Sequence, residues 1–141
     1  MIRAATVLFV FVFGFVLTAA AQDFKPPAGS GKVYFKNLKN GASVPTTFKV
    51  EFGVDGLRVR PAGEDPLDHT SGHHHVIIDG RPIPVGQPVP VDDHDLHFGK
   101  GQTEGQITLP AGRHTLTLQF ADGAHLSYGP KWAATITVNV T

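Results

Sequence analysis

The sequence contains no cysteine, and its single methionine is Met1. Without cysteine no disulfide can cross-link the fold, so an apolar core must hold it together. Met1 falls in the segment that is predicted below to be removed as a signal peptide, so the mature chain would have neither thiolate nor thioether side chains, and metal sites built on sulfur ligands are excluded from it. Any transition-metal site in this chain must therefore use nitrogen or oxygen atoms.

The sequence also lacks an excess of charge of either sign. Its 12 basic and 12 acidic residues cancel to a formal net charge of zero. Binding to nucleic acid depends mainly on clusters of Lys and Arg facing the phosphates, and no such cluster occurs here. The composition thus gives no support to a nucleic-acid partner.

The first residues, MIRAATVLFVFVFGFVLTAAAQ, combine Arg3, a short apolar run and three consecutive alanines. This is the pattern of a cleaved secretory signal peptide, which we place at residues 1–21. The apolar run is shorter than the roughly 20 residues of a membrane-spanning helix, so no span is expected after cleavage. These features predict a periplasmic or secreted protein with a flexible leader at 22–31 and one domain at 32–141.

No segment sustains a 3.6-residue hydrophobic repeat, and 16 glycines and 11 prolines interrupt every long stretch. Alternating apolar residues instead predict seven short strands, with turn residues between them. The predicted strands are 32–35, 47–54, 73–79, 95–98, 105–109, 114–120 and 132–140. This pattern is typical of an all-β fold, and we predict an immunoglobulin-like antiparallel β-sandwich of about seven strands.

Histidine is abundant: the chain has eight, and six of them lie between positions 69 and 97. In an immunoglobulin-like strand order, the loops after the second, fourth and sixth strands meet at one end of the sandwich. That end would gather the GHHH run and residues from two distant loops. The candidate metal ligands are His73, His74, His75, His97, His125 and Glu104.

Neutral imidazole is the commonest metal ligand in proteins, and several such nitrogens suit Cu(II) or Zn(II). His73 and His75 would share one face of their strand, because alternate residues point the same way. His97 and His125 would complete the set, with His74 and Glu104 as alternative ligands or supporting groups. Copper is favoured over zinc, since Cu(II) binds a given nitrogen site more tightly.

The other histidines have simpler interpretations. His69 and His94 are expected at the surface. His114 shares its parity with Leu116 and Leu118, so it is expected to face inward and to hydrogen-bond a backbone carbonyl, although a role as a ligand stays open. We expect His94 and His114 at the end of the sandwich opposite the cluster.

Two other functions fit the same residues. The cluster could be a hydrogen-bonded group that orders the loops of a non-metal module, which would contact a protein or polymer of the cell envelope. The protein could also be a small copper redox enzyme, but the sequence places no clear general acid or base beside the cluster. An enzymatic role is therefore the less favoured interpretation.

Three motifs occur in a fixed order: GHHH at 72–75, HFGKGQTE at 97–104 and LPAGRHTL at 109–116. In this combination the chain resembles a family of bacterial exported proteins, the domain-of-unknown-function family 4399 (DUF4399), over roughly residues 33–140. One departure follows His125, where LSYGPKW supplies only Pro130 and no further histidine. The resemblance implies an exported β-sandwich and singles out these histidines, but it implies no particular ligand.

Overall fold

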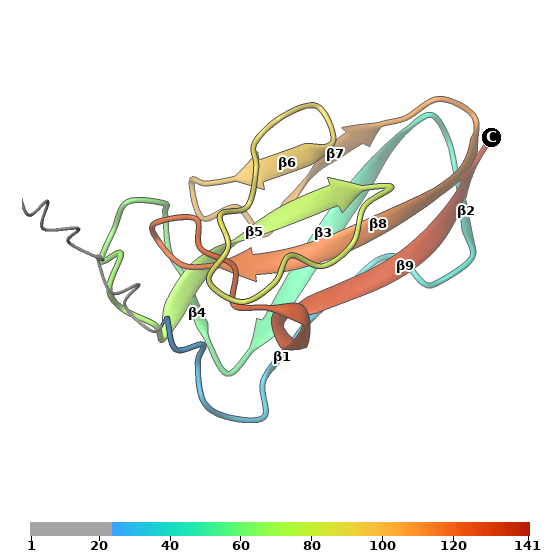
Figure 1. Cartoon of the computed structure of the whole chain (residues 1–141). Helices are drawn as coiled ribbons and strands as arrows, with labels where there is room; N and C mark the ends of the chain where they lie inside the picture. The colour runs from blue at the N-terminus through green and yellow to red at the C-terminus, as the bar shows by residue number, and fades with distance from the viewer. Residues whose placement is uncertain (1–23) are drawn as a thin grey trace, which may run out of the picture.

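The computed structural model describes residues 24–141, and within them the fold is all-β (Figure 1). The predicted signal peptide lies outside the described residues. Nine strands and one short 3-10 helix, η1 (Pro130–Trp132), make up the regular structure of the described part, which contains no α-helix. The predicted all-β class is therefore confirmed.

The smaller sheet has three antiparallel strands in the order β1–β3–β7. These are β1 (Lys32–Phe35), β3 (Thr47–Asp55) and β7 (Glu104–Thr108). In β3 the apolar residues Phe48, Val50 and Phe52 are buried, whereas Lys49 between them is exposed. This alternation is the period-2 pattern of a strand with one face on a core.

The larger sheet has the order β2–β9–β8–β5–β4, with β6 also pairing with β5. Its strands are β2 (Ala42–Val44), β4 (Arg58–Val59), β5 (Ser71–Ile78), β6 (Asp95–Phe98), β8 (Gly112–Ala121) and β9 (Ala133–Val140). The pairs β2–β9 and β4–β5 are parallel, so this sheet is mixed rather than wholly antiparallel. β2 and β4 were not predicted, because two or three residues are too few to show a periodic pattern.

One apolar core lies between the two sheets. Phe52 from β3 and Leu118 and Phe120 from β8 are completely buried in it, and Trp132 of η1 is 1% exposed. Burying large aliphatic and aromatic side chains contributes about 1.5–3 kcal/mol each. This core replaces the disulfides that a chain without cysteine cannot form.

The outer face of the larger sheet is also covered, by the proline-rich segment 80–94 and the loop 122–129. Gln119 projects from β8 toward this segment and accepts a hydrogen bond from the backbone N–H of Ile83. The hydroxyl of Ser127 donates to the Ile83 carbonyl, and Pro88 forms an isolated bridge with Leu126. Residues of β5 that point away from the main core are therefore buried as well.

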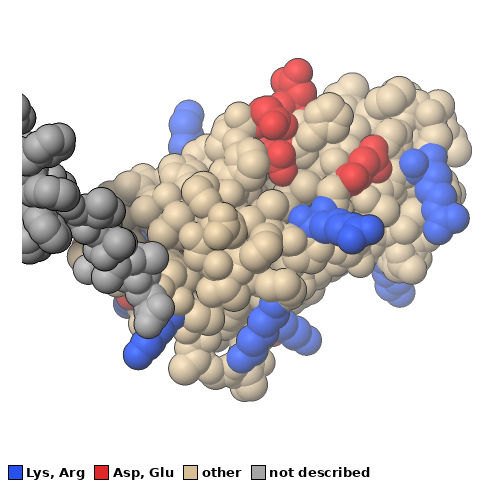
Figure 2. All heavy atoms as spheres, in the orientation of Figure 1, with Lys and Arg blue, Asp and Glu red and all other residues tan. Residues whose placement is uncertain are grey.

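Charged side chains are scattered on the surface. On the face shown in Figure 2, basic side chains occur singly and form no continuous patch. Over residues 24–141 no helix combines the length and hydropathy required to cross a lipid bilayer.

Candidate metal centre

The three consecutive histidines of β5 are completely buried but point in opposite directions. His74 faces the main core, where its ring lies 5.1 Å from the ring of Phe52 and 4.9 Å from that of Phe120. His73 and His75 face the covered outer side, with ring centroids 4.8 Å apart. Strand alternation therefore assigns two of the three imidazoles to a shared site.

Two further imidazoles reach this outer site from distant parts of the sequence. His97 of β6 is the direct strand partner of His75, and their ring centroids lie 5.0 Å apart. His125, in the loop after β8, lies 4.9 Å from His73 and 4.7 Å from His97 by the same measure. The predicted convergence of imidazoles from these three segments is present in the structure, on the covered outer side of the larger sheet.

The nitrogen atoms of these rings approach closely. The Nε2 atoms of His73 and His75 are 3.0 Å apart, and so are those of His97 and His125. In each pair one nitrogen donates a proton and the other accepts it. One ligand atom from each of His73, His97 and His125 lies within 4.8 Å of the other two, close enough to hold a metal ion.

Burial keeps the inner imidazoles neutral. It lowers the pKa of His73 from 6.5 to about 3, with further lowering by His125 and His97. Burial likewise lowers the pKa of His75 to about 2, helped by the charges of the neighbouring histidines, and it lowers the pKa of His97. Because metals bind only the neutral ring, these groups need not lose a proton near neutral pH before coordinating an ion.

The position of the His97 ring depends on Gly99. A Cβ atom at residue 99 would lie 2.1 Å from Cε1 and 2.2 Å from Nε2 of His97. Any larger residue would therefore displace the ring and its proposed ligand atom. Gly99 lies in the HFGKGQTE motif, but the sequence alone does not show which ring it accommodates.

His125 has a left-handed backbone conformation, with φ of 65°. Non-glycine residues adopt this region rarely, although histidine tolerates it better than most. Asp122 stabilises the turn, because its Oδ1 accepts the backbone N–H groups of Ala124 and Leu126 at 2.9 and 2.8 Å. The His125 N–H also donates to the Asp122 carbonyl. Sequence reasoning did not identify Asp122, although Asp-Gly after a strand is a turn signal.

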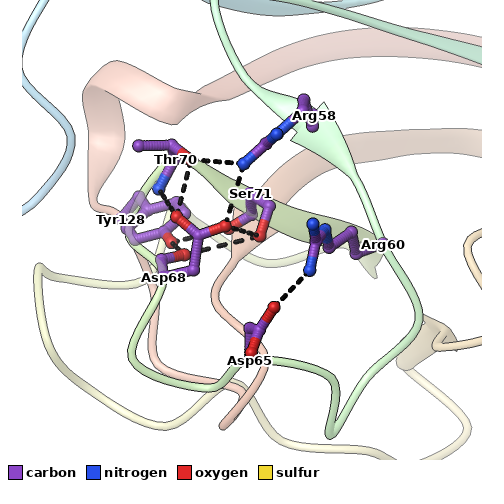
Figure 3. Close-up of polar contacts among 7 residues, drawn as sticks. All are labelled: Arg58, Arg60, Asp65, Asp68, Thr70, Ser71 and Tyr128. Atoms are coloured by element: carbon purple, nitrogen blue, oxygen red, sulfur yellow. Dashed lines mark hydrogen bonds and ion pairs between the residues drawn. The ribbon is translucent and has the colours of Figure 1, made fainter.

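A polar network fixes the start of β5, as shown in Figure 3. The carboxylate of Asp68 accepts hydrogen bonds from the hydroxyls of Thr70 and Ser71 and from Arg58. These bonds, above all that from Thr70, lower the pKa of Asp68 well below its ordinary range. The Tyr128 hydroxyl donates to the Ser71 carbonyl at 2.7 Å. The network holds the loop before His73 against the loop that carries His125.

The remaining predicted ligands lie elsewhere. His74 occupies the opposite face of β5, so its ring is separated from the other imidazoles by the sheet. Glu104 begins β7 in the smaller sheet, where its exposed carboxylate pairs with Lys49 at 2.9 Å. Neither belongs to the group of side chains whose ligand atoms converge within the described part of the chain.

The other histidines also have defined places. His114 lies at the far end of β8, with Nδ1 2.8 Å from Asp79 and Nε2 3.0 Å from the carbonyl oxygen of Pro110. The expected bond to a backbone carbonyl is therefore present. His94 is exposed, as expected, whereas His69 is half-buried against Phe24. Phe24 comes from the segment predicted to be a flexible leader, yet it packs on the folded body.

Comparisons with known proteins give one match. The family model described as "Domain of unknown function (DUF4399)" matches residues 50–141, which include every residue of the histidine cluster. No curated protein and no solved structure matches the chain. The matched segment covers more than half of the sequence, so the chain belongs to the DUF4399 family of domains of unknown function.

Proposed function

We propose that this protein binds a divalent transition metal at the end of its β-fold, through His73, His97 and His125 with His75 beside them. The observation that carries the proposal is the convergence of imidazoles from β5, β6 and the loop after β8. Three separate segments supply the rings, and the sheet register and loop hydrogen bonds hold them in place.

The spacing of the nitrogens supports this proposal. With metal–nitrogen bonds of about 2.0–2.1 Å, adjacent ligand atoms lie about 2.9–3.4 Å apart. The two Nε2 pairs, each 3.0 Å apart, have this separation. His73 is buried whereas His97 and His125 are partly exposed, so an ion could enter from the solvent side.

The chemistry of the ligand set favours copper. Imidazole nitrogen suits Cu(II) and Zn(II) and is a poor match for Mg(II) or Ca(II), which prefer oxygen. Cu(II) binds a nitrogen site more tightly than Zn(II), so we place copper ahead of zinc. The role would be delivery, buffering or sensing of the metal.

The proposed protein is exported, as a periplasmic or secreted immunoglobulin-like β-sandwich. The pattern of residues 1–21 supports export, and the two sheets around one core support the sandwich. Intact-mass analysis of the protein recovered from the producing cell tests export. A mature chain starting at Gln22 is expected, and an uncleaved chain would contradict it.

Metal analysis and thermal unfolding with Cu(II), Zn(II) or a chelator test the binding. A ligand at about 1,000 times its dissociation constant adds about 4 kcal/mol to the free energy of unfolding. His97→Ala should remove most of this gain, because it removes one of the proposed ligands. The variant should still fold, since His97 lies on the edge strand β6 and its loss leaves the core intact. His94→Ala is the matched control, because this exposed residue precedes the same strand.

The competing interpretation is a hydrogen-bonded histidine cluster that orders the loops without a metal. It predicts no stabilisation by either ion and no bound metal in the purified protein. Equal stabilisation of the His97→Ala and His94→Ala variants by the metal ion would contradict the assignment of His97 to the site.

A further inference from the structure

A cavity of about 460 Å³ lies beside the loop that carries His125, and the metal proposal does not use it. Ala124 and Leu126, on either side of His125, line the cavity, whereas the His125 ring turns toward His97. We call it the Phe24 cavity, because the Phe24 side chain forms part of its wall. Small-molecule sites in proteins commonly have volumes of roughly 300–1,000 Å³.

The wall of the Phe24 cavity is mostly apolar. Phe24, Pro66, Leu67, Ala124 and Leu126 contribute to it, and Leu67 is 88% exposed. The Phe24 ring stacks on Tyr128 with centroids 5.9 Å apart, which holds one aromatic side chain at the cavity wall. A ligand with an alkyl or aryl body would therefore bury apolar surface here.

The two polar side chains that line the cavity can both accept hydrogen bonds. Asp122 is only 1% exposed; its Oδ1 accepts two backbone N–H groups, and no residue in 24–141 donates to its Oδ2. His69 has Nδ1 2.8 Å from the Lys25 carbonyl oxygen, which can only accept, so Nδ1 is the donor and the tautomer with a single ring proton leaves Nε2 as an acceptor. The cavity therefore favours a ligand that donates hydrogen bonds.

The local charges favour a cation. Over residues 24–141 no Lys or Arg pairs with Asp122, whereas the nearby arginines are already engaged: Arg58 pairs with Asp68, and Arg60 with Asp65. The pKa of the Tyr128 hydroxyl is raised mainly by burial and, to a smaller extent, by the negative charges of Asp122 and Asp68. Their effect indicates a negative potential at this end of the fold. The face of an aromatic ring such as Phe24 also attracts cations.

We propose that the Phe24 cavity binds small organic amines in their ammonium form, with an alkyl or aryl body against the apolar wall and the ammonium group at Asp122. The carboxylate supplies the opposite charge, and the imidazole of His69 supplies a second acceptor. The proposal does not depend on metal binding, because the His73, His97 and His125 rings take no part in this cavity.

Phenethylamine is a suitable probe, titrated into the ¹⁵N-labelled protein in the presence of a chelator and followed by amide chemical shifts. We expect saturable shifts in the segments 66–69 and 122–126. The uncharged analogue 2-phenylethanol should bind about tenfold more weakly, because it lacks the positive charge that pairs with the Asp122 carboxylate. No saturable shift, or equal affinity for the two compounds, would overturn the proposal.

Two variants localise the site. Asp122→Asn retains an oxygen to cap the turn but removes the charge, and it should abolish the preference for the amine. Phe24→Ala removes part of the wall outside the two sheets and should weaken binding of both compounds without disturbing the fold. Asp93→Asn, an exposed acidic residue, is the matched control. Unchanged affinity in both Asp122→Asn and Phe24→Ala would refute the location.

Discussion

Replacing His74 by leucine should stabilise the protein, although this residue lies in the most distinctive motif of the sequence. The His74 side chain is completely buried against Phe52 and Phe120, and neither ring nitrogen has a hydrogen-bond partner among residues 24–141. Leaving a buried polar group unpaired costs about 1–3 kcal/mol. Leucine has a similar volume and no polar atom, so His74→Leu should raise the free energy of unfolding by about that amount near pH 8.

The stabilisation should grow in acid. Burial lowers the pKa of His74 from 6.5 to about 3 in the folded protein. Below pH 6.5 the unfolded chain binds a proton at this residue that the folded protein does not, so lowering the pH destabilises the fold. A pH of about 5 lies about 1.5 units below the pKa of His74 in the unfolded chain, so this one group lowers the free energy of unfolding by about 2 kcal/mol. His74→Leu removes this loss.

Urea unfolding of metal-free protein near pH 8 and pH 5 provides the measurement, with His94→Leu as a control on an exposed histidine. Overpacking by leucine would reduce stability equally at both pH values, so the difference between them isolates the titration of His74. If His74→Leu gave the same change in free energy at both pH values, the reasoning about its burial would be wrong.

Three further predictions concern the histidine site and its supports. Gly99→Ala should weaken Cu(II) binding about tenfold or more, because a Cβ atom displaces the His97 ring while every ligand is retained; unchanged affinity in a copper titration would contradict this role. Residues 73–75 all have pKa values lowered by burial, so the metal-free protein should melt at a lower temperature at about pH 5 than at pH 8. A melting temperature that is independent of pH would argue against neutral buried rings. Tyr128→Phe should lower the free energy of unfolding by about 1–2 kcal/mol, since it removes the hydrogen bond to the buried Ser71 carbonyl; urea unfolding checks this, and a change below about 0.5 kcal/mol would oppose it.

The long strands could be predicted from the sequence because alternation of apolar residues is a local signal. The strands at 32–35 and 95–98 have the predicted bounds, and the others differ by one or two residues at one or both ends. β2 and β4 escaped prediction, since their parallel pairing with β9 and β5 depends on residues distant in sequence. The covering of the outer face of β5 was also not predicted, because prolines at 82–90 indicate irregular backbone but not where it packs.

By itself the sequence determined which chemistry is available: no sulfur ligand, many imidazoles, and an alternation that separates His74 from His73 and His75. Only the tertiary structure decided which rings meet, because contacts between β5, β6 and the loop after β8 depend on strand register and on turn geometry at His125. It also decided that Glu104 pairs with Lys49 on the other sheet, and that Gly99 leaves room for the His97 ring. Periodicity acts over neighbouring residues, whereas a site assembled from distant segments depends on how the whole chain packs.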